Sequence, residues 1–150
     1  MSDQLQLEKQ LCFRLYRLNK AMNRLYAPIL KPLQLTYPQY LVMLVLWQTN
    51  KSIAVKTLGE KLDLDSGTLS PLLKRLEKIG YIARKRSLDD ERQVNIELTI
   101  QGKQLKQSAE KIPALMFAQT GLSIEGLQQL SQQLDDLLDN INIASNELAS

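Results

Sequence analysis

The sequence predicts a mainly α-helical protein that carries one small β-hairpin. Apolar residues recur at spacings of three and four along most of the chain, which is the pattern of amphipathic helices. Residues 81–87 and 93–99 instead alternate between apolar and polar side chains, as β-strands do, and a charged turn separates them. We therefore expect several helices around a single hairpin, in one domain that covers residues 1–150.

Composition places the chain among ordinary globular proteins. Hydrophobic residues make up 44% and charged residues 23% of its 150 residues, which is enough to bury a real core. The longest apolar run, residues 40–47, is far too short to span a bilayer. Residues 1–10 do not have the pattern of a signal peptide. These features predict a cytoplasmic protein with no membrane partner.

Charge is spread unevenly along the chain. Residues 1–50 hold six cations and two acids, residues 51–106 twelve and eight, and residues 107–150 one and six. The basic first two thirds suit a polyanionic partner, although a solvated surface also produces such asymmetry. The chain has one cysteine and no histidine. An internal disulfide, a zinc cluster and a histidine-dependent catalytic triad are therefore excluded, and we expect no cofactor, metal or catalytic residue.

The N-terminal segment predicts a long helix from about Ser2 to Tyr26 that stops before Pro28. Cys12 lies beside its apolar stripe, and Tyr16 is one turn further along the same face. Such a stripe must pack against the core or against a second copy of the chain. The stripe consists of Leu7, Leu11, Leu15, Leu18, Met22 and Leu25.

The middle of the chain predicts a compact series of short elements. Residues 27–36 contain two prolines and predict an interrupted connector. A nearly all-apolar helix follows, starting at Thr36–Pro38 and ending near Asn50. Residues 51–55 are expected to be extended, residues 57–62 to form a short helix, and residues 63–65 a tight turn.

Residues 62–80 predict an amphipathic helix suited to reading DNA. Asp65 and Ser66 can cap it, and Gly80 can close it. Its polar face has small side chains first and cations later, as a helix in the major groove requires. An ordinary surface helix has the same pattern, and Ser66 fits a simple capping role. The polar face comprises Ser66, Thr68, Ser70, Pro71, Lys74, Arg75 and Lys78.

Together these elements predict a winged helix-turn-helix over residues 36–106. The hairpin directly after the reading helix is the wing, and its cations Arg84, Lys85 and Arg86 can meet phosphates. Arg92 near the tip can enter a minor groove. Its guanidinium group can also pair with Asp90 or Glu91, and the acid can orient it. The alternative is that these cations form a solvated surface. The acidic residues at the tip are interpreted as solvent-exposed side chains and not as metal ligands.

The C-terminal segment predicts further helices. Residues 101–119 are helical in pattern, with Pro113 kinking or restarting the helix. Ser123 can cap the last helix, which has a leucine-rich stripe. The two terminal segments, residues 1–35 and 107–150, have no place in a simple winged helix. They are therefore interpreted as dimerisation helices of a homodimer.

Over its whole length the chain resembles the MarR family of transcriptional regulators. The wing signature of that family is matched by Asp90, Arg92, Leu98 and Thr99. The resemblance is closer to one branch, the organic-hydroperoxide-sensing repressors of OhrR type. It is carried by LCFRLY at 11–16, LTYPQYLVMLVLW at 35–47 and LDSGTLSPLLKRLE at 64–77.

This resemblance implies a role for the cysteine. In that branch a cysteine at the position of Cys12 senses peroxide, and tyrosines matching Tyr16, Tyr26 and Tyr37 surround the sulfur, some from the other subunit. With no second cysteine the chain resembles the one-cysteine type, in which a small thiol captures the oxidised sulfur or the sulfur is overoxidised. From the residues alone, Cys12 also fits a buried apolar position and the tyrosines fit interface packing.

The expected function is that of a repressor. A homodimer binds a pseudo-palindromic operator in double-stranded DNA, and organic hydroperoxide, followed by a small thiol, modifies Cys12 and releases the DNA. One alternative is a MarR-type regulator that a phenolic or lipophilic ligand releases. Two more distant alternatives are a thiol peroxidase and a winged-helix adaptor that binds no DNA.

Overall fold

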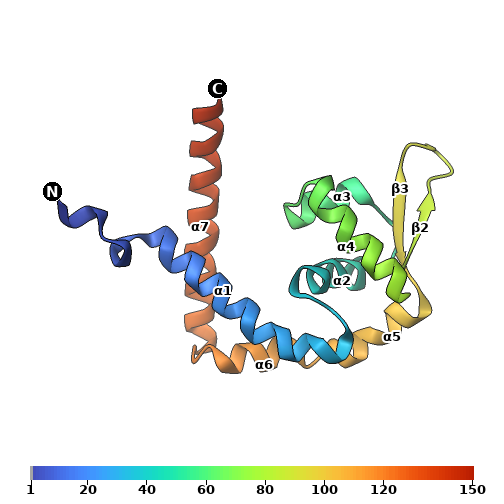
Figure 1. Cartoon of the computed structure of the whole chain (residues 1–150), viewed down its shortest axis with the longest axis horizontal. Coiled ribbons are helices and arrows are strands. Elements are labelled where there is room, and N and C mark those ends of the chain that lie inside the picture. Colours follow the sequence, from blue (N-terminus) through green and yellow to red (C-terminus); the bar gives the residue numbers. More distant parts are fainter. Residues whose placement is uncertain (1) are drawn as a thin grey trace. The chain divides into compact units, whose positions relative to one another are not determined.

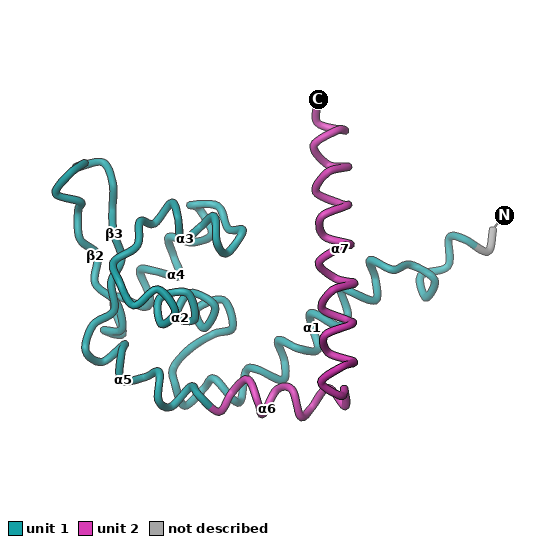
Figure 2. The backbone as a smooth tube through the Cα atoms, turned by 180° about the vertical axis from the view of Figure 1, so that it is seen from behind, with its two compact units in different colours: residues 1–110 teal, residues 111–150 magenta. Residues whose placement is uncertain are grey.

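The computed structural model describes residues 2–150, with the side chains of residues 4–150. The chain forms two compact units, residues 1–110 and residues 111–150 (Figure 2). The first unit contains all elements from the N-terminal turns to α5, and the second contains α6 and α7 (Figure 1). The predicted single domain over residues 1–150 stays a prediction.

The N-terminal helix begins later and ends later than predicted. Two short 3-10 turns, η1 (Ser2–Leu5) and η2 (Leu7–Lys9), precede α1 (Leu11–Leu30). The prediction of one helix from Ser2 was wrong because Gln10 is extended, and its side-chain amide donates to the carbonyls of Gln4 at 2.7 Å and Gln6 at 3.1 Å. These bonds hold the preceding turns apart from the helix.

Pro28 does not end α1, contrary to prediction. Proline removes one N–H and so one hydrogen bond, and this loss falls in the last turn, where helices fray in any case. The N–H of Lys31 still donates to the carbonyl of Ala27. The connector that follows contains the 3-10 turn η3 (Lys31–Leu33), which ends at Gln34 in a left-handed conformation with φ 57°.

The central helix α2 (Tyr37–Thr49) is buried as predicted. The side chain of Gln39 accepts a hydrogen bond from the N–H of Thr36 at 2.9 Å, as in a capping box. Its buried residues face the rest of the first unit and form the centre of the core. They are Gln39, Tyr40, Val42, Met43, Leu46 and Trp47.

The helix-turn-helix and the wing are present as predicted. The elements are α3 (Val55–Leu62), α4 (Ser66–Ile79), β2 (Ile82–Arg86) and β3 (Val94–Leu98), and Figure 1 shows the hairpin extending beyond the end of α4. The sheet has a third, unexpected strand, β1 (Ile53–Ala54), in the antiparallel order β1-β3-β2. Two residues are too few to show alternation, so the sequence indicated only an extended segment.

Local signals at both ends of α4 explain why its bounds could be predicted. Asp65 is the N-cap, and its carboxylate accepts from the N–H of Thr68 at 2.7 Å. Ser66 is consequently the first helical residue and not the cap. Gly80 ends the helix with φ 96°, a conformation that glycine adopts at little cost. Leu69, Leu73 and Leu76 are buried on the inner face.

Helix α5 (Ile100–Ala109) completes the first unit. In the second unit, α6 (Ile112–Gln119) has Pro113 in its first turn, so this proline restarts the helix as predicted. Ser123 caps α7 (Ile124–Ala149) by accepting from the N–H of Gly126 at 3.0 Å. None of the helices described is both long and apolar enough to cross a membrane.

Apolar stripes on both terminal helices are exposed in the single chain. On α1, Leu11 and Leu18 are 53% and 52% exposed. On α7, five members of the predicted stripe are exposed, namely Leu127, Leu130, Leu134, Leu138 and Ile141. Exposed apolar stripes of this kind mark surfaces that associate with another chain.

The cap of α4 makes a prediction about pH. The hydrogen bond from the Thr68 N–H holds the pKa of Asp65 below its usual value. The carboxylate therefore stabilises the fold above the ordinary aspartate pKa of about 4, and this contribution is lost as pH falls through the lower, folded-state pKa. We expect Asp65→Ala to lower the thermal midpoint of unfolding at pH 7. In acid, the difference in thermal midpoint between this variant and the native protein should be smaller.

Asp65→Asn is the matched control, because asparagine also caps helices but carries no titrating carboxylate. Its thermal midpoint should lie nearer the native value at pH 7. A gap between the Ala variant and the native protein that stays constant from pH 7 to pH 3 would contradict this assignment.

Candidate nucleic-acid interface and cysteine sensor

A hollow between α4 and the wing brings together residues that the sequence singled out separately. It has a volume of about 470 Å³. Ser66 and Ser70 line it from α4, and Arg84, Asp90 and Arg92 line it from the hairpin. Hydroxyl groups and cations thus face one surface recess, which is the combination that DNA phosphates and base edges require. Thr68, Pro71 and Lys74 are exposed on α4 outside this hollow.

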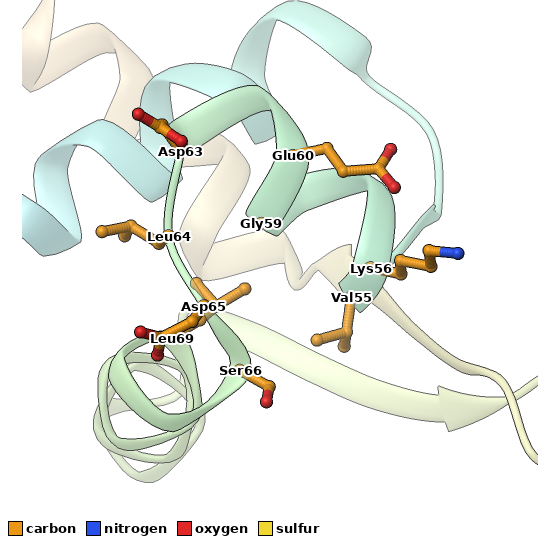
Figure 3. A pocket seen from close by; sticks show the side chains of 9 residues that line it. All are labelled: Val55, Lys56, Gly59, Glu60, Asp63, Leu64, Asp65, Ser66 and Leu69. Atoms are coloured by element: carbon orange, nitrogen blue, oxygen red, sulfur yellow. The ribbon is translucent and has the colours of Figure 1, made fainter. Parts of the chain in front are cut away.

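A second hollow, of about 720 Å³, lies between α3 and the start of α4. Figure 3 shows Val55 and Lys56 on α3 across from Ser66 on α4. Lys56 and Ser66 line both hollows, so the two are continuous along this face. The sequence did not single out Lys56, because the short helix was expected to begin at residue 57. A cation in the first turn of the preceding helix was the signal that could have found it.

The wing cations differ in their environments. Nε of Arg84 lies 3.1 Å from Oε2 of Glu77 on α4, so this ion pair ties the wing to the reading helix. Lys85 pairs with Glu97 on the neighbouring strand. Arg86 is exposed near the end of β2. The predicted phosphate contacts of Arg84 and Lys85 would have to compete with these ion pairs.

Asp90 acts on the backbone of the wing tip. Its Oδ1 accepts from the backbone N–H of Arg92 at 3.0 Å, whereas we expected it to orient the guanidinium group of Arg92. An aspartate bonded to the N–H two residues later forms an Asx-turn, which fixes the path of the chain. Asp90 therefore positions the segment that carries Arg92, and the Arg92 side chain is exposed at the tip.

Arg75 lies apart from the other predicted DNA-binding residues. It lines a cavity of about 600 Å³ together with residues of α1, the connector and the start of α2. Lys31 contributes a second cation there, and the described lining residues include no carboxylate. Its assignment to DNA remains a prediction.

Cys12 is an exposed free cysteine in the first turn of α1. The later start of the helix places it next to free backbone N–H groups and the positive end of the helix dipole. Tyr16 follows one turn later, is 60% exposed, and has the Nζ of Lys20 5.3 Å from its ring centroid. A reactive cysteine needs thiolate character and access to solvent, and Cys12 has the access.

Tyr26 and Tyr37 pack against each other, with ring centroids 4.5 Å apart. Tyr40, which the sequence did not single out, lies 5.8 Å from Tyr26 and extends this cluster into the core. Burial, and secondly the neighbouring phenol of Tyr37, raises the pKa of both Tyr26 and Tyr40. Their hydroxyl groups therefore stay protonated and can donate hydrogen bonds.

The structure does not bring Cys12 and this cluster together within one chain. Cys12 and Tyr26 lie on the same continuous helix and are 14 residues apart. A rise of 1.5 Å per residue separates them by about 21 Å, far beyond the reach of either side chain. Only Tyr16 among the three predicted tyrosines lies near Cys12 in the same chain.

Comparison with known proteins now defines the family. The family described as "Transcriptional regulator SarA/Rot" matches residues 24–109. The organic hydroperoxide resistance transcriptional regulator of Bacillus subtilis is 47% identical over 140 residues, which cover 93% of this chain and 95% of that protein. The chain belongs to the MarR/SarA family of transcriptional regulators. The resemblance found in the sequence is thereby confirmed.

Solved structures of AbfR, a protein of Staphylococcus epidermidis, agree with this fold. Reduced AbfR bound to DNA is 34% identical with a TM-score of 0.76, covering 93% of this chain and 97% of that chain. Overoxidised AbfR bound to DNA is 35% identical with the same TM-score, covering 93% and 98%. The matched relatives of this MarR/SarA member are regulators and not enzymes.

The exposed position of Arg92 predicts a mutant phenotype. We expect Arg92→Ala to weaken DNA binding and to reduce the slope of log K against log salt by about 1, because one cation–phosphate contact is lost. The thermal midpoint should barely change, since the side chain is exposed. Fluorescence anisotropy over a salt series measures the affinity.

Lys61→Ala is the matched control, because Lys61 is an exposed cation on α3 that lines neither hollow. It should change DNA binding less than Arg92→Ala. If both substitutions weaken DNA binding equally, Arg92 contributes only its positive charge and makes no specific contact with DNA.

Proposed function

We propose that the protein is a homodimeric repressor that binds operator DNA and releases it when organic hydroperoxide oxidises Cys12. The observation that carries this proposal is an exposed free cysteine at the start of a helix with an unpartnered apolar stripe. A covalent change there would act directly on the surface where a second copy packs. The name of the Bacillus subtilis relative supports hydroperoxide as the signal.

The DNA-binding part of the proposal follows from the reading helix and the wing. In a two-fold dimer, two such helices enter successive major grooves about 34 Å apart on a pseudo-palindromic site. The α4 side chains meet base edges and phosphates, and Arg92 at the wing tip reaches the adjacent minor groove. The proposed contact residues are Ser66, Thr68, Ser70, Pro71, Lys74, Arg75, Arg84, Lys85, Arg86 and Arg92, with Asp90 shaping the tip.

The sensing chemistry needs two balanced steps. The Cys12 thiolate attacks the peroxide oxygen, the O–O bond breaks, and a sulfenate and an alcohol form; the sulfenate then takes up a proton from water to give the sulfenic acid. A small thiol then attacks the oxidised sulfur, which yields a mixed disulfide and water. Negative charge on the sulfur lies beside the free N–H groups of the first turn of α1. The reaction is stoichiometric and takes place in the cytoplasm, where both DNA and reduced small thiols occur.

The dimer completes the sensor. Tyr26 lies about 21 Å from Cys12 along α1, and Tyr37 on α2 packs against Tyr26, so we infer that both tyrosines meet the sulfur from a second copy of the chain. Their hydroxyl groups would donate hydrogen bonds to the thiolate and to the sulfenate. An adduct on Cys12 displaces these donors, shifts the packing of the terminal helices and changes the spacing of the two reading heads. A coupling of only a few kcal/mol changes DNA occupancy by orders of magnitude.

Replacing the cysteine tests this proposal. We expect cumene hydroperoxide with a small thiol to release operator DNA from the native protein, and Cys12→Ser to keep its DNA under the same treatment. Serine is nearly isosteric and cannot form a sulfenic acid. Anisotropy of labelled operator DNA measures both.

Dithiothreitol is the control for side reactions, because it reverses a mixed disulfide but not oxidation of the four methionines. Release from the native protein should therefore be reversible. Oxidative release from Cys12→Ser as complete as from the native protein would rule out the cysteine as the sensor.

The cavity beside Arg75 supports a second candidate function, a regulator released by a small ligand. Its volume of about 600 Å³ falls in the range of small-molecule sites, and its two cations suit a phenolic acid. Tyr37 also lines it, so a ligand would touch the tyrosine cluster directly. Under this hypothesis Cys12 takes no part in release.

Reducing conditions separate the two candidates. If the cavity holds an effector, hydroxybenzoates should weaken operator binding in the presence of dithiothreitol, and Arg75→Gln should weaken that response at least about tenfold, as loss of a charge-assisted hydrogen bond implies. Lys78→Gln, an exposed cation on the same helix outside the cavity, is the matched control. DNA binding that hydroxybenzoates leave unchanged would remove this candidate.

A further inference from the structure

The end of the reading helix and the base of the wing meet at Tyr81. This residue follows Gly80, the C-cap of α4, directly precedes β2, and is only 4% exposed. Its N–H donates to the carbonyl of Leu76 at 3.0 Å, and its carbonyl accepts from the N–H of Thr99 at 3.1 Å. The Thr99 hydroxyl donates to the carbonyl of Gly80 at 2.6 Å. Tyr81 thus moves with both α4 and the wing.

The side chain of Tyr81 reaches a different part of the first unit. Its hydroxyl donates to the carbonyl of Leu33 at 2.9 Å, across 48 residues of sequence and in a buried setting. Leu33 belongs to η3, in the connector between α1 and α2. Burial raises the pKa of Tyr81, so the hydroxyl keeps the proton that it donates.

The connector that Tyr81 holds lies between the two sensor tyrosines. Tyr26 is near the end of α1, Tyr37 is the first residue of α2, and their rings are in contact. The connector is not a loose loop, because η3 contains Pro32 and ends with hydrogen bonds at Gln34 and Leu35. A movement of the tyrosine pair therefore displaces Leu33 and its hydrogen bond.

A second series of contacts also connects the tyrosine cluster to Tyr81. Tyr40 contacts Tyr26, its ring lies 6.4 Å from that of Trp47, and Nε1 of Trp47 donates to the carbonyl of Gly102 at 2.9 Å. Gly102 is pressed against the base of the wing, since a Cβ there would lie only 2.0 Å from the Tyr81 carbonyl oxygen. Both routes from the tyrosine cluster end at Tyr81.

We propose that Tyr81 is a positioning residue that couples the α1–α2 connector to the reading helix and the wing. The hydrogen bond to Leu33 transmits the change at the sensor tyrosines to the DNA-binding surface. This inference rests on the proposed function, because it assigns the route by which Cys12 oxidation lowers DNA affinity. A bond that only stabilised the fold would contribute equally in the reduced and oxidised states and would leave their affinity ratio unchanged.

Tyr81→Phe keeps the ring and removes the hydroxyl group. The measurement is the ratio of operator dissociation constants in the oxidised and reduced states, together with the rate at which Cys12 loses its thiol. We expect this ratio to fall about fivefold, the fold-change that corresponds to one hydrogen bond of typical net strength. The reduced-state affinity should remain within about threefold of native, and Cys12 should react at the native rate, since the sensor itself is unchanged.

Ile53→Val is the matched control, because it trims one buried methyl group in β1 and leaves both links intact. It should lower the thermal midpoint slightly and keep the native ratio. If Tyr81→Phe does not fold, Trp47→Phe, which removes the second link, replaces it and should lower the ratio.

The outcomes separate the two proposals. A native protein that keeps its DNA after Cys12 oxidation refutes the redox function itself. A native protein that releases DNA, with a variant whose ratio equals the native ratio, refutes the coupling role of Tyr81 and leaves the redox function in place. A lowered ratio with a native thiol reaction rate supports the coupling role.

Discussion

The rigidity of α1 is the constraint on which the sensor depends. One continuous helix carries Cys12 in its first turn and Tyr26 near its end, and therefore keeps them about 21 Å apart. The single chain therefore has the thiol at one site and the phenol of Tyr26 at another. Two copies, arranged about a two-fold axis, can place each thiol against the phenols of the other copy. Under the proposal, dimerisation is thus required for sensing as well as for reading two half-sites.

A dimer would also explain why the apolar stripes are exposed in the single chain. Leucines on α1 and α7 expose surface that a soluble monomer would bury. The thiol lies on a helix with such a stripe. Under the proposal this stripe packs in the dimer, so an adduct on the sulfur would change the packing of that surface. The reading head itself is firmly built, with buried leucines, caps at both ends of α4 and a sheet of three strands. Under the proposal such a head moves as a unit, and its position in the dimer sets the affinity for DNA.

Elements with local signals could be predicted from the sequence. Asp65 and Gly80 cap the two ends of α4, Ser123 caps the start of α7, and Pro113 lies in the first turn of α6. Caps and prolines act within one helical turn, so these helix ends can be recognised from nearby residues. The start of α1 could not be predicted, since it depends on a side-chain amide that bonds carbonyls four and six residues away. The strand β1 is recognisable only through its pairing with β3.

The same limit applies to the candidate site. Residues on the exposed face of α4 could be named, but the sequence could not show which neighbour each one meets. Arg75 turned out to line the cavity beside α1 and α2, and Arg84 is paired with Glu77. Lys56 was missed because the short helix was expected to begin at residue 57, and Tyr40 was missed because it joins the site only through contact with Tyr26.

A mixed dimer tests the completion of the sensor by two copies most directly. One subunit carries Cys12→Ser, the other carries Tyr26→Phe with Tyr37→Phe, and two affinity tags isolate the heterodimer. Its one remaining cysteine lies on the subunit without these tyrosines. If the phenols act across the dimer, this cysteine reacts with cumene hydroperoxide as fast as that of a native and Cys12→Ser mixed dimer. A rate as slow as that of the double tyrosine variant alone would contradict the account.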